Sequence, residues 1–122
     1  MIKKGAQDAA NTDNVEFKYS SSGDIPTQST FIQNAIDSKV DGNAVSMPDP
    51  SALAPVVQKA VAAGIPVAAF NAGDREWQKT GALAFCGEPE VLAGEFAGTK
   101  LNELGSTHTL CVQAQGQVQL ED

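Results

Sequence analysis

The chain has 122 residues, which is enough for one hydrophobic core but too few for two full domains. Its 15 acidic and 8 basic residues give a formal net charge of −7, and the basic residues are scattered along the sequence. Because nucleic-acid binding depends on clustered cations that neutralise phosphates, we expect no nucleic-acid partner. No apolar run approaches the roughly 20 residues that a membrane-spanning helix needs, so we also expect no membrane insertion.

Helical and strand patterns alternate along the chain. In order, the sequence predicts a helix over 2–11, a strand over 15–19, a helix over 26–38, a strand over 43–47, a helix over 55–63, strands over 65–70 and 82–86, a helix over 89–104 and a strand over 107–113. Strands separated by helices and short loops are typical of a parallel sheet with right-handed crossovers. The expected fold class is therefore α/β, a parallel sheet flanked by helices on both faces.

Side-chain periodicity predicts the elements of the N-terminal third. Residues 15–19 read Val-Glu-Phe-Lys-Tyr, and this alternation of apolar and polar side chains is typical of a half-buried strand. In the following helix, Phe31, Ile32 and Ile36 recur at helical spacing. They form an apolar stripe that would face the sheet.

Prolines mark the middle of the chain. Pro48 closes the apolar strand, and Asp49 followed by Pro50 is a helix-start signal. However, Pro55 would interrupt the interior of a helix that began there, because proline lacks an N–H and clashes with the preceding turn. We therefore expect a tight turn over 50–54 and a helix that begins near Pro55 and stops at Gly64.

The C-terminal half is predicted from apolar runs. Residues 65–70 are almost continuously apolar, as in parallel strands that are buried on both faces. Within the helix over 89–104, Gly94 and Gly98 each cost about 1 kcal/mol relative to alanine, which predicts close packing of the helix backbone against another element. The expected apolar side of this helix carries Leu92, Phe96 and Leu101.

The sequence contains no pattern that indicates catalysis or a cofactor. There is no nucleophile elbow, phosphate-binding loop or metal-ligand spacing, so we expect a protein that is not an enzyme and uses no cofactor or metal. Cys86 and Cys111 lie in apolar segments, which favours buried thiols, with a disulfide as the alternative in an oxidising compartment. The N-terminus has lysines but no apolar segment, so we expect no signal peptide within this chain.

Two runs of sequence follow one another closely in the middle of the chain. The first is Val40–Pro50, which reads Val-Asp-Gly-Asn-Ala-Val-Ser-Met-Pro-Asp-Pro. The second is Ala63–Gly73, which reads Ala-Gly-Ile-Pro-Val-Ala-Ala-Phe-Asn-Ala-Gly. Both runs resemble the sugar-binding receptors of ABC importers, the periplasmic binding proteins similar to the ribose-binding protein. A later segment, Cys86–Gly94, is similar to the hinge and following helix of these receptors. The resemblance implies the flavodoxin-like lobe of a sugar receptor that acts outside the cytoplasm with an ABC permease.

The carboxyl ends of the strands supply the candidate binding residues. Ligands of open α/β sheets lie at these ends, and Met47, Asp49 and Asn71 all lie at the ends of predicted strands. In the resembling family, the residue at the position of Asn71 holds sugar hydroxyls. Met47 departs from the polar residue that several relatives place there, and Asp49 also fits a helix cap. Trp77 lies in the next loop, where its ring could stack on a sugar or simply pack against the core.

The resemblance also implies that parts of a complete receptor are missing from this sequence. The family begins with a strand before the first helix and continues through a second lobe. On this basis, residues 1–87 correspond to a partial N-terminal lobe that lacks the first strand. Residues 88–122 correspond to the hinge crossing and the first helix–strand unit of the second lobe.

Two functions remain open on the sequence alone. The first is part of a sugar receptor that cannot enclose its ligand without a second lobe. The second is an α/β interaction or oligomerisation module derived from such a receptor, which does not bind sugar. Because open strand edges and a helix–strand unit without its lobe favour exchange between chains, we also expect a homodimer.

Overall fold

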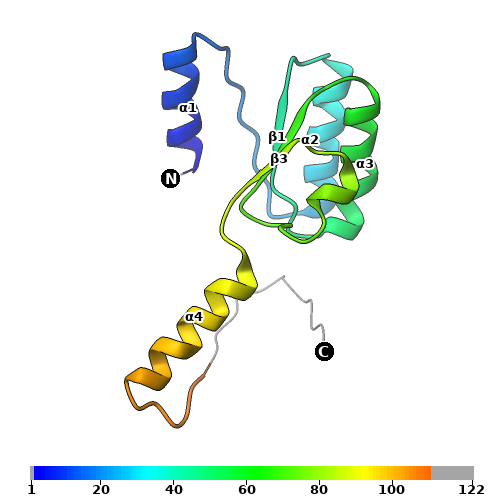
Figure 1. The fold of residues 1–122 in the computed structure, drawn as a ribbon. Coiled ribbons are helices and arrows are strands. Elements are labelled where there is room, and N and C mark those ends of the chain that lie inside the picture. Colours follow the sequence, from blue (N-terminus) through cyan, green and yellow to red (C-terminus); the bar gives the residue numbers. More distant parts are fainter. Residues whose placement is uncertain (1, 111–122) are drawn as a thin grey trace.

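The computed structural model describes residues 2–110 (Figure 1). Its helices are α1 (Ile2–Asp13), α2 (Ile25–Asp37), α3 (Pro50–Ala62) and α4 (Glu90–Glu103), and η1 (Trp77–Thr80) is a short 3-10 helix. Its strands are β1 (Asn43–Val45), β2 (Val67–Phe70) and β3 (Ala84–Cys86).

The three strands form one parallel sheet in the order β1-β2-β3. The register aligns Ala44 with Ala68, and Ala68 with Ala84. Each parallel connection crosses over through a helical segment, α3 between β1 and β2 and η1 between β2 and β3. The predicted α/β class with a parallel sheet flanked by helices is therefore confirmed.

Helices α2 and α3 cover one face of the sheet, and the hydrophobic core lies between them and the strands (Figure 1). Alternate strand residues point into this core, as the pleat of a strand requires. The buried core residues from the two helices and the sheet are Ile32, Val45, Met47, Leu53, Val57, Ala60, Val67, Ala69 and Ala82. Helix α1 lies on the other side of the sheet in Figure 1, where its only buried residue is Ala10.

The starts of α2 and α3 are set by the same local signal. Asp24 caps α2 by accepting a hydrogen bond from the backbone N–H of Thr27 at 2.9 Å. Asp49 caps α3 in the same way, accepting from the N–H of Ala52 at 3.0 Å. Each cap is followed within two residues by a proline, whose missing N–H is not needed in the first turn.

The predicted start of the third helix at Pro55 is wrong. Helix α3 begins at Pro50 and includes Pro55 in its interior. Proline at this position removes the hydrogen bond that would reach the carbonyl of Ser51. Ser51 is exposed to solvent, so water can satisfy that carbonyl and the helix continues. The strong Asp49–Pro50 start signal therefore outweighs the interior proline.

The predicted strand over residues 15–19 is also wrong, since these residues form no strand. A strand needs a neighbour to satisfy its backbone hydrogen bonds, and the sheet of the described chain ends at β1. The segment associates instead with α1. The N–H of Val15 bonds to the carbonyl of Ala10 at 2.9 Å, and the ammonium of Lys3 lies 5.1 Å from the ring centre of Tyr19.

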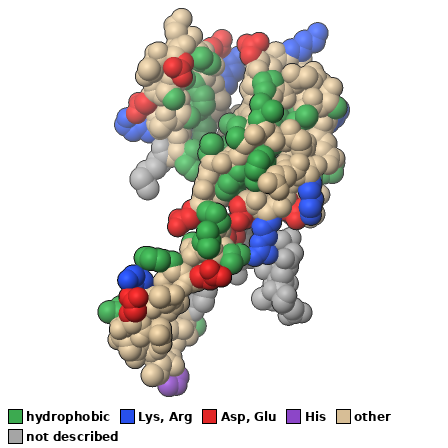
Figure 2. Space-filling view, viewed as in Figure 1, with side chains coloured by type: hydrophobic (Ala, Val, Ile, Leu, Met, Phe, Trp, Pro, Cys, Tyr) green, Lys and Arg blue, Asp and Glu red, His purple; other side chains and the backbone are tan. Residues whose placement is uncertain are grey.

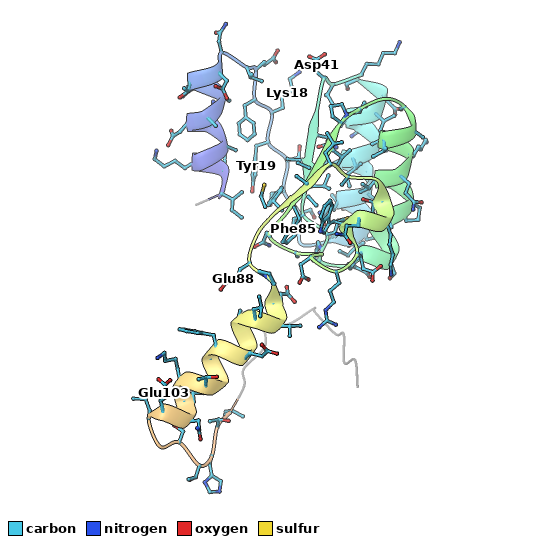
Figure 3. The ribbon with its side chains drawn as sticks, in the orientation of Figure 1. Lys18, Tyr19, Asp41, Phe85, Glu88 and Glu103 are labelled. Atoms are coloured by element: carbon cyan, nitrogen blue, oxygen red, sulfur yellow. The ribbon has the colours of Figure 1, made fainter. Side chains whose placement is uncertain are left out.

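Helix α4 does not pack as predicted. The chain leaves the sheet after Cys86, passes Glu88 and enters α4, which extends away from the other elements (Figures 1 and 3). No residue of α4 is buried. An added Cβ at Gly94 or Gly98 would meet no described residue within 4 Å, so within residues 2–110 no element makes the close approach that we expected at these glycines.

Two further predictions concern the C-terminal part. Residues 107–110 form no strand, and the rest of the predicted strand, 111–113, lies outside the described residues. Cys86 is exposed rather than buried, because it is the last residue of an edge strand and points to the face that α2 and α3 leave open. Cys111 lies outside the described residues. Among residues 2–110, no helix is both long enough and apolar enough to cross a membrane.

Candidate functional site

The carboxyl ends of the three strands meet at one edge of the sheet. The chain continues from β1 into Ser46, from β2 into Asn71 and from β3 into Gly87. Two backbone hydrogen bonds beyond the strands fix this edge. The N–H of Asn71 bonds to the carbonyl of Cys86 at 3.1 Å, and the N–H of Met47 bonds to the carbonyl of Ala72 at 3.2 Å. These two bonds hold the start of the loops after β1 and β2 against the neighbouring chain segments.

Asn71 is an exposed polar residue at this edge. Its backbone is left-handed, with φ 64°, a conformation that asparagine tolerates better than most residues. Its side chain is exposed, and its Nδ2 lies 3.5 Å from the hydroxyl oxygen of Ser46, at the limit of a hydrogen bond. Such a long contact leaves the amide free to donate to and accept from another molecule.

Ser46 is a candidate that sequence reasoning missed. Its neighbours Val45 and Met47 are both buried in the core. Because strand side chains alternate, Ser46 points to the opposite face, beside Asn71. The side-chain amide of Gln28 donates to the Ser46 carbonyl and so fixes the strand end from α2. A polar residue between two buried apolar ones at the end of a strand was the available signal.

The Asp49 carboxylate is engaged as a helix cap. It accepts from the Ser51 hydroxyl at 2.7 Å as well as from the N–H of Ala52. These two bonds, that of the Ser51 hydroxyl first, lower the pKa of Asp49 below its ordinary value. The carboxylate therefore acts as the N-cap of α3, and a ligand would have to compete with Ser51 and Ala52 for its oxygens.

The cap predicts an effect on stability. We expect Asp49→Ala to lower the free energy of unfolding by about 1 kcal/mol, within the 0.5–2 range found for caps. Because the pKa of Asp49 is lowered by folding, this contribution is present above its unfolded pKa of about 3.9 and is lost as the pH falls through the folded value. Urea unfolding at neutral and acidic pH measures both effects. Asp49→Asn, which caps without titrating, should keep the stability and lose that part of the pH dependence.

Two of the predicted site residues, Met47 and Trp77, pack against the hydrophobic core. Met47 is fully buried, with 0% of its surface exposed, and belongs to the core between the helices and the sheet. Trp77 is half-buried and packs against the same core from η1. Its carbonyl accepts a hydrogen bond from the buried hydroxyl of Thr80 at 2.6 Å. Of the four predicted site residues, Asn71 is exposed, Asp49 and Trp77 are half-buried, and Met47 is buried.

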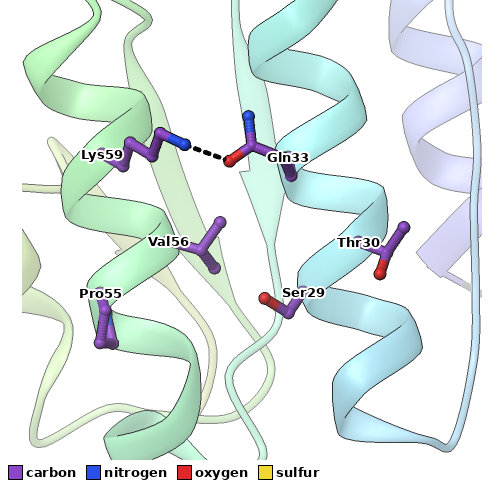
Figure 4. A pocket seen from close by; sticks show the side chains of 6 residues that line it. All are labelled: Ser29, Thr30, Gln33, Pro55, Val56 and Lys59. Atoms are coloured by element: carbon purple, nitrogen blue, oxygen red, sulfur yellow. Dashed lines mark hydrogen bonds between the residues drawn. The ribbon is translucent and has the colours of Figure 1, made fainter.

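A separate groove of about 450 Å³ lies between α2 and α3 (Figure 4). Its floor is apolar, with Pro55 and Val56, and the Lys59 ammonium donates to the side-chain carbonyl of Gln33 at 2.6 Å across it. The groove lies between the helices, on the side of the molecule that faces away from the sheet. It is therefore a different place from the polar edge formed by Asn71 and Ser46.

Comparison with known families gives a match over nearly the whole chain. The model of the periplasmic binding protein domain matches residues 1–120. The chain belongs to this family. The resemblance found in the sequence is thereby confirmed, and members of the family act as extracytoplasmic binding proteins rather than as enzymes.

A solved structure of the same kind supports the assignment. The crystal structure of a carbohydrate transporter from Acidothermus cellulolyticus 11B, in complex with myo-inositol, is 51% identical in sequence and superposes with a TM-score of 0.91. The match covers 95% of this chain and 41% of that protein. The chain therefore spans less than half the length of this relative. A comparison with curated proteins finds no significant match.

Proposed function

We propose that this chain forms one wall of a cleft that binds a sugar or a cyclic polyol of the myo-inositol type. The observation that carries the proposal is the exposed amide of Asn71, held beside the Ser46 hydroxyl at the carboxyl edge of a parallel sheet. The 51% identical transporter protein in complex with myo-inositol supports this class of ligand. In the complete receptor, the bound molecule would be handed to an ABC permease outside the cytoplasm.

The chemistry of the edge suits a neutral, hydroxyl-rich ligand. Each hydroxyl of a polyol both donates and accepts a hydrogen bond, and an asparagine amide offers both functions on one short side chain. The Ser46 hydroxyl adds a second group of the same kind. Because the backbone N–H of Asn71 is bonded to β3 and the carbonyl of Ser46 to Gln28, little conformational entropy is lost when a ligand binds.

A single wall gives only part of the binding energy. Ligand sites of this type bury most of the ligand surface between two walls, whereas the described edge leaves Asn71 open to water. We expect this chain alone to bind myo-inositol or simple sugars no more tightly than about 1 mM, which is about −4 kcal/mol. Asp49 contributes to the same edge but remains mainly a helix cap.

Removal of the Asn71 amide tests the proposal. Asn71→Gly is the informative variant, because glycine accepts the left-handed backbone that would strain an alanine. We expect the affinity for myo-inositol to fall about 3- to 10-fold, as for a lost hydrogen bond between neutral groups. Ligand-observed NMR with increasing concentrations of myo-inositol measures affinities in this range.

The matched control is Asn34→Ala, which removes an exposed amide from the surface of α2. This variant should bind as the parent chain does. If Asn71→Gly and the parent bind equally, the amide makes no contact and the proposed site is wrong. Micromolar binding by a monomer of the parent chain would show instead that one wall is sufficient.

A second function, an interaction module that does not bind sugar, is favoured by one observation. Helix α4 exposes several large apolar side chains that a soluble domain normally covers.

A further inference from the structure

The loop after β2 begins with a tight three-residue turn that has Asn71 at its centre. The N–H of Ala72 bonds back to the carbonyl of Phe70 at 2.7 Å, which closes a γ-turn. Asn71 has φ 64°, and the γ-turn with a positive φ at its central residue is the rare and strained form. A strained backbone persists only where the surrounding structure holds it, and such strain is concentrated at functional sites. The turn therefore needs support from its neighbours.

Backbone hydrogen bonds on both sides hold this turn. On the side of β3, the N–H of Asn71 donates to the carbonyl of Cys86 at 3.1 Å. On the side of β1, the N–H of Met47 donates to the carbonyl of Ala72 at 3.2 Å. The φ angle of Asn71 sets where its Cα–Cβ bond points relative to the preceding peptide. Holding the turn thus holds the Asn71 amide beside the Ser46 hydroxyl, 3.5 Å away.

Gly87, the first residue after β3, lies against this turn. A Cβ added to Gly87 would lie 3.2 Å from the backbone nitrogen of Asn71, closer than the 3.4–4 Å of an ordinary contact. It would also lie 2.7 Å from Cζ and 2.8 Å from Cε1 of the Phe85 ring. That ring is half-buried and packs against the hydrophobic core. A side chain at position 87 would therefore push on both the ring and the turn.

Neither backbone conformation nor burial explains the glycine at this position. Gly87 is not among the glycines with a positive φ, so its own backbone does not require glycine. It is exposed, and charged side chains gather where the chain passes from β3 toward α4 (Figure 2). No packing within the core therefore demands a small residue here. What glycine provides is the close approach to Asn71.

We propose that Gly87 is a positioning residue for the Asn71 amide. Without a Cβ at Gly87, the carboxyl end of β3 lies close enough for the Cys86 carbonyl to hold the N–H of Asn71. This bond keeps the γ-turn in the form that presents the amide at the edge of the sheet, so less conformational entropy is lost when a ligand binds. Because the amide contacts the ligand only in the proposed function, this role rests on that proposal.

A mutant cycle with myo-inositol tests whether Gly87 acts through Asn71. We expect Gly87→Ala to weaken binding about 3- to 10-fold, as Asn71→Gly does, because both lose the same hydrogen bond to the ligand. The double variant should bind as Asn71→Gly alone does, since the amide that Gly87 positions is already gone. The matched control is Gly42→Ala, just before β1, where an added Cβ would come no closer than 3.8 Å to Pro66. This control should bind as the parent chain does in ligand-observed NMR.

A second measurement needs no ligand and separates this role from the proposed function. It is the NMR coupling across the hydrogen bond between the Asn71 nitrogen and the Cys86 carbonyl carbon, in the isotope-labelled full chain. We expect this coupling in the parent and in Gly42→Ala, and its loss in Gly87→Ala. If the parent does not bind myo-inositol, the proposed function fails, and the coupling alone decides whether Gly87 holds the turn.

Phe85→Leu keeps the test decisive if the collision with the ring unfolds Gly87→Ala. Leucine lacks the two ring atoms that the added Cβ would meet, so the pair Phe85→Leu with Gly87→Ala leaves only the contact with Asn71. This pair should lose the coupling that Phe85→Leu alone retains. A coupling that survives in the pair or in Gly87→Ala overturns the proposal. So does a loss of affinity that adds to that of Asn71→Gly, because Gly87 would then act independently of the amide.

Discussion

Gly73→Ala is expected to lower the free energy of unfolding by about 2–5 kcal/mol. Gly73 follows Asn71 and Ala72 in a backbone conformation with φ 96°, which costs an alanine about 1–2 kcal/mol. The added Cβ would lie 2.9 Å from the Cβ of Met47 and 3.2 Å from its carbonyl oxygen. Met47 is fully buried and cannot move aside, so overpacking adds about 1–3 kcal/mol. The glycine thus lets the loop after β2 lie directly on the core.

The control for this variant is Gly64→Ala. Gly64 lies just after the C-terminal end of α3. Gly64 has φ 82°, but an added Cβ would meet nothing within 4 Å. It should therefore show only the conformational cost of about 1–2 kcal/mol. Urea unfolding of both variants measures the difference. Equal losses at the two positions would mean that the loop can move away from Met47.

Leu53→Ala is expected to lower the free energy of unfolding by about 2–5 kcal/mol. Leu53 projects from α3 into the core and has 0% of its surface exposed. Its removal leaves a cavity between the helix and the sheet that the packed strands cannot fill. For a domain whose whole stability is about 5–15 kcal/mol, this is a large fraction.

Leu83→Ala provides the comparison, because Leu83 is 74% exposed just before β3. That variant should change stability by no more than about 0.5 kcal/mol. The two can be compared in one series of urea titrations, since both remove the same atoms. A loss below about 1 kcal/mol for Leu53→Ala would contradict the position of the core between α3 and the sheet.

The parallel sheet was predictable because its central strands carry their own signal. One strand is a continuous apolar run that ends at Phe70, and the other is the apolar segment after Gly42. Such runs are typical of parallel strands that are buried within a sheet. Helix α2 was predictable because Phe31, Ile32 and Ile36 recur at helical spacing, and of these Ile32 is buried in the core and Ile36 packs against it. Local sequence was sufficient wherever pattern, cap and burial agreed.

The errors arose where structure depends on a partner distant in sequence. Residues 15–19 alternate as a strand does, but alternation shows only which side chains would share a face and does not supply a neighbouring strand. Helix α4 was given an apolar side by the spacing of Leu92 and Phe96, whereas no described element covers it. For α3, the interior proline was given more weight than a start signal that the fold supports with buried Leu53.

The candidate site was predictable in its place but not in its members. A residue that follows a parallel strand reaches the ligand edge by topology, which is why Asn71 could be identified. Its contact with Ser46 depends on the pairing of Val45 with Ala69. This register cannot be inferred from the sequence of either strand alone. The close approach of Gly87 to Asn71 likewise depends on how the strands pair. A Cβ added at Gly87 would lie 3.2 Å from the backbone nitrogen of Asn71.

Mapping where a polyol binds is the most direct test of the claim that the strand ends form a sugar site. The measurement is a titration of the isotope-labelled chain with myo-inositol, followed through its amide resonances. The account predicts that the signals of Ser46, Asn71 and Gly87 shift together, with a midpoint above about 1 mM. Shifts confined to the groove of Gln33 and Lys59, or no shift at any soluble concentration of ligand, would contradict it.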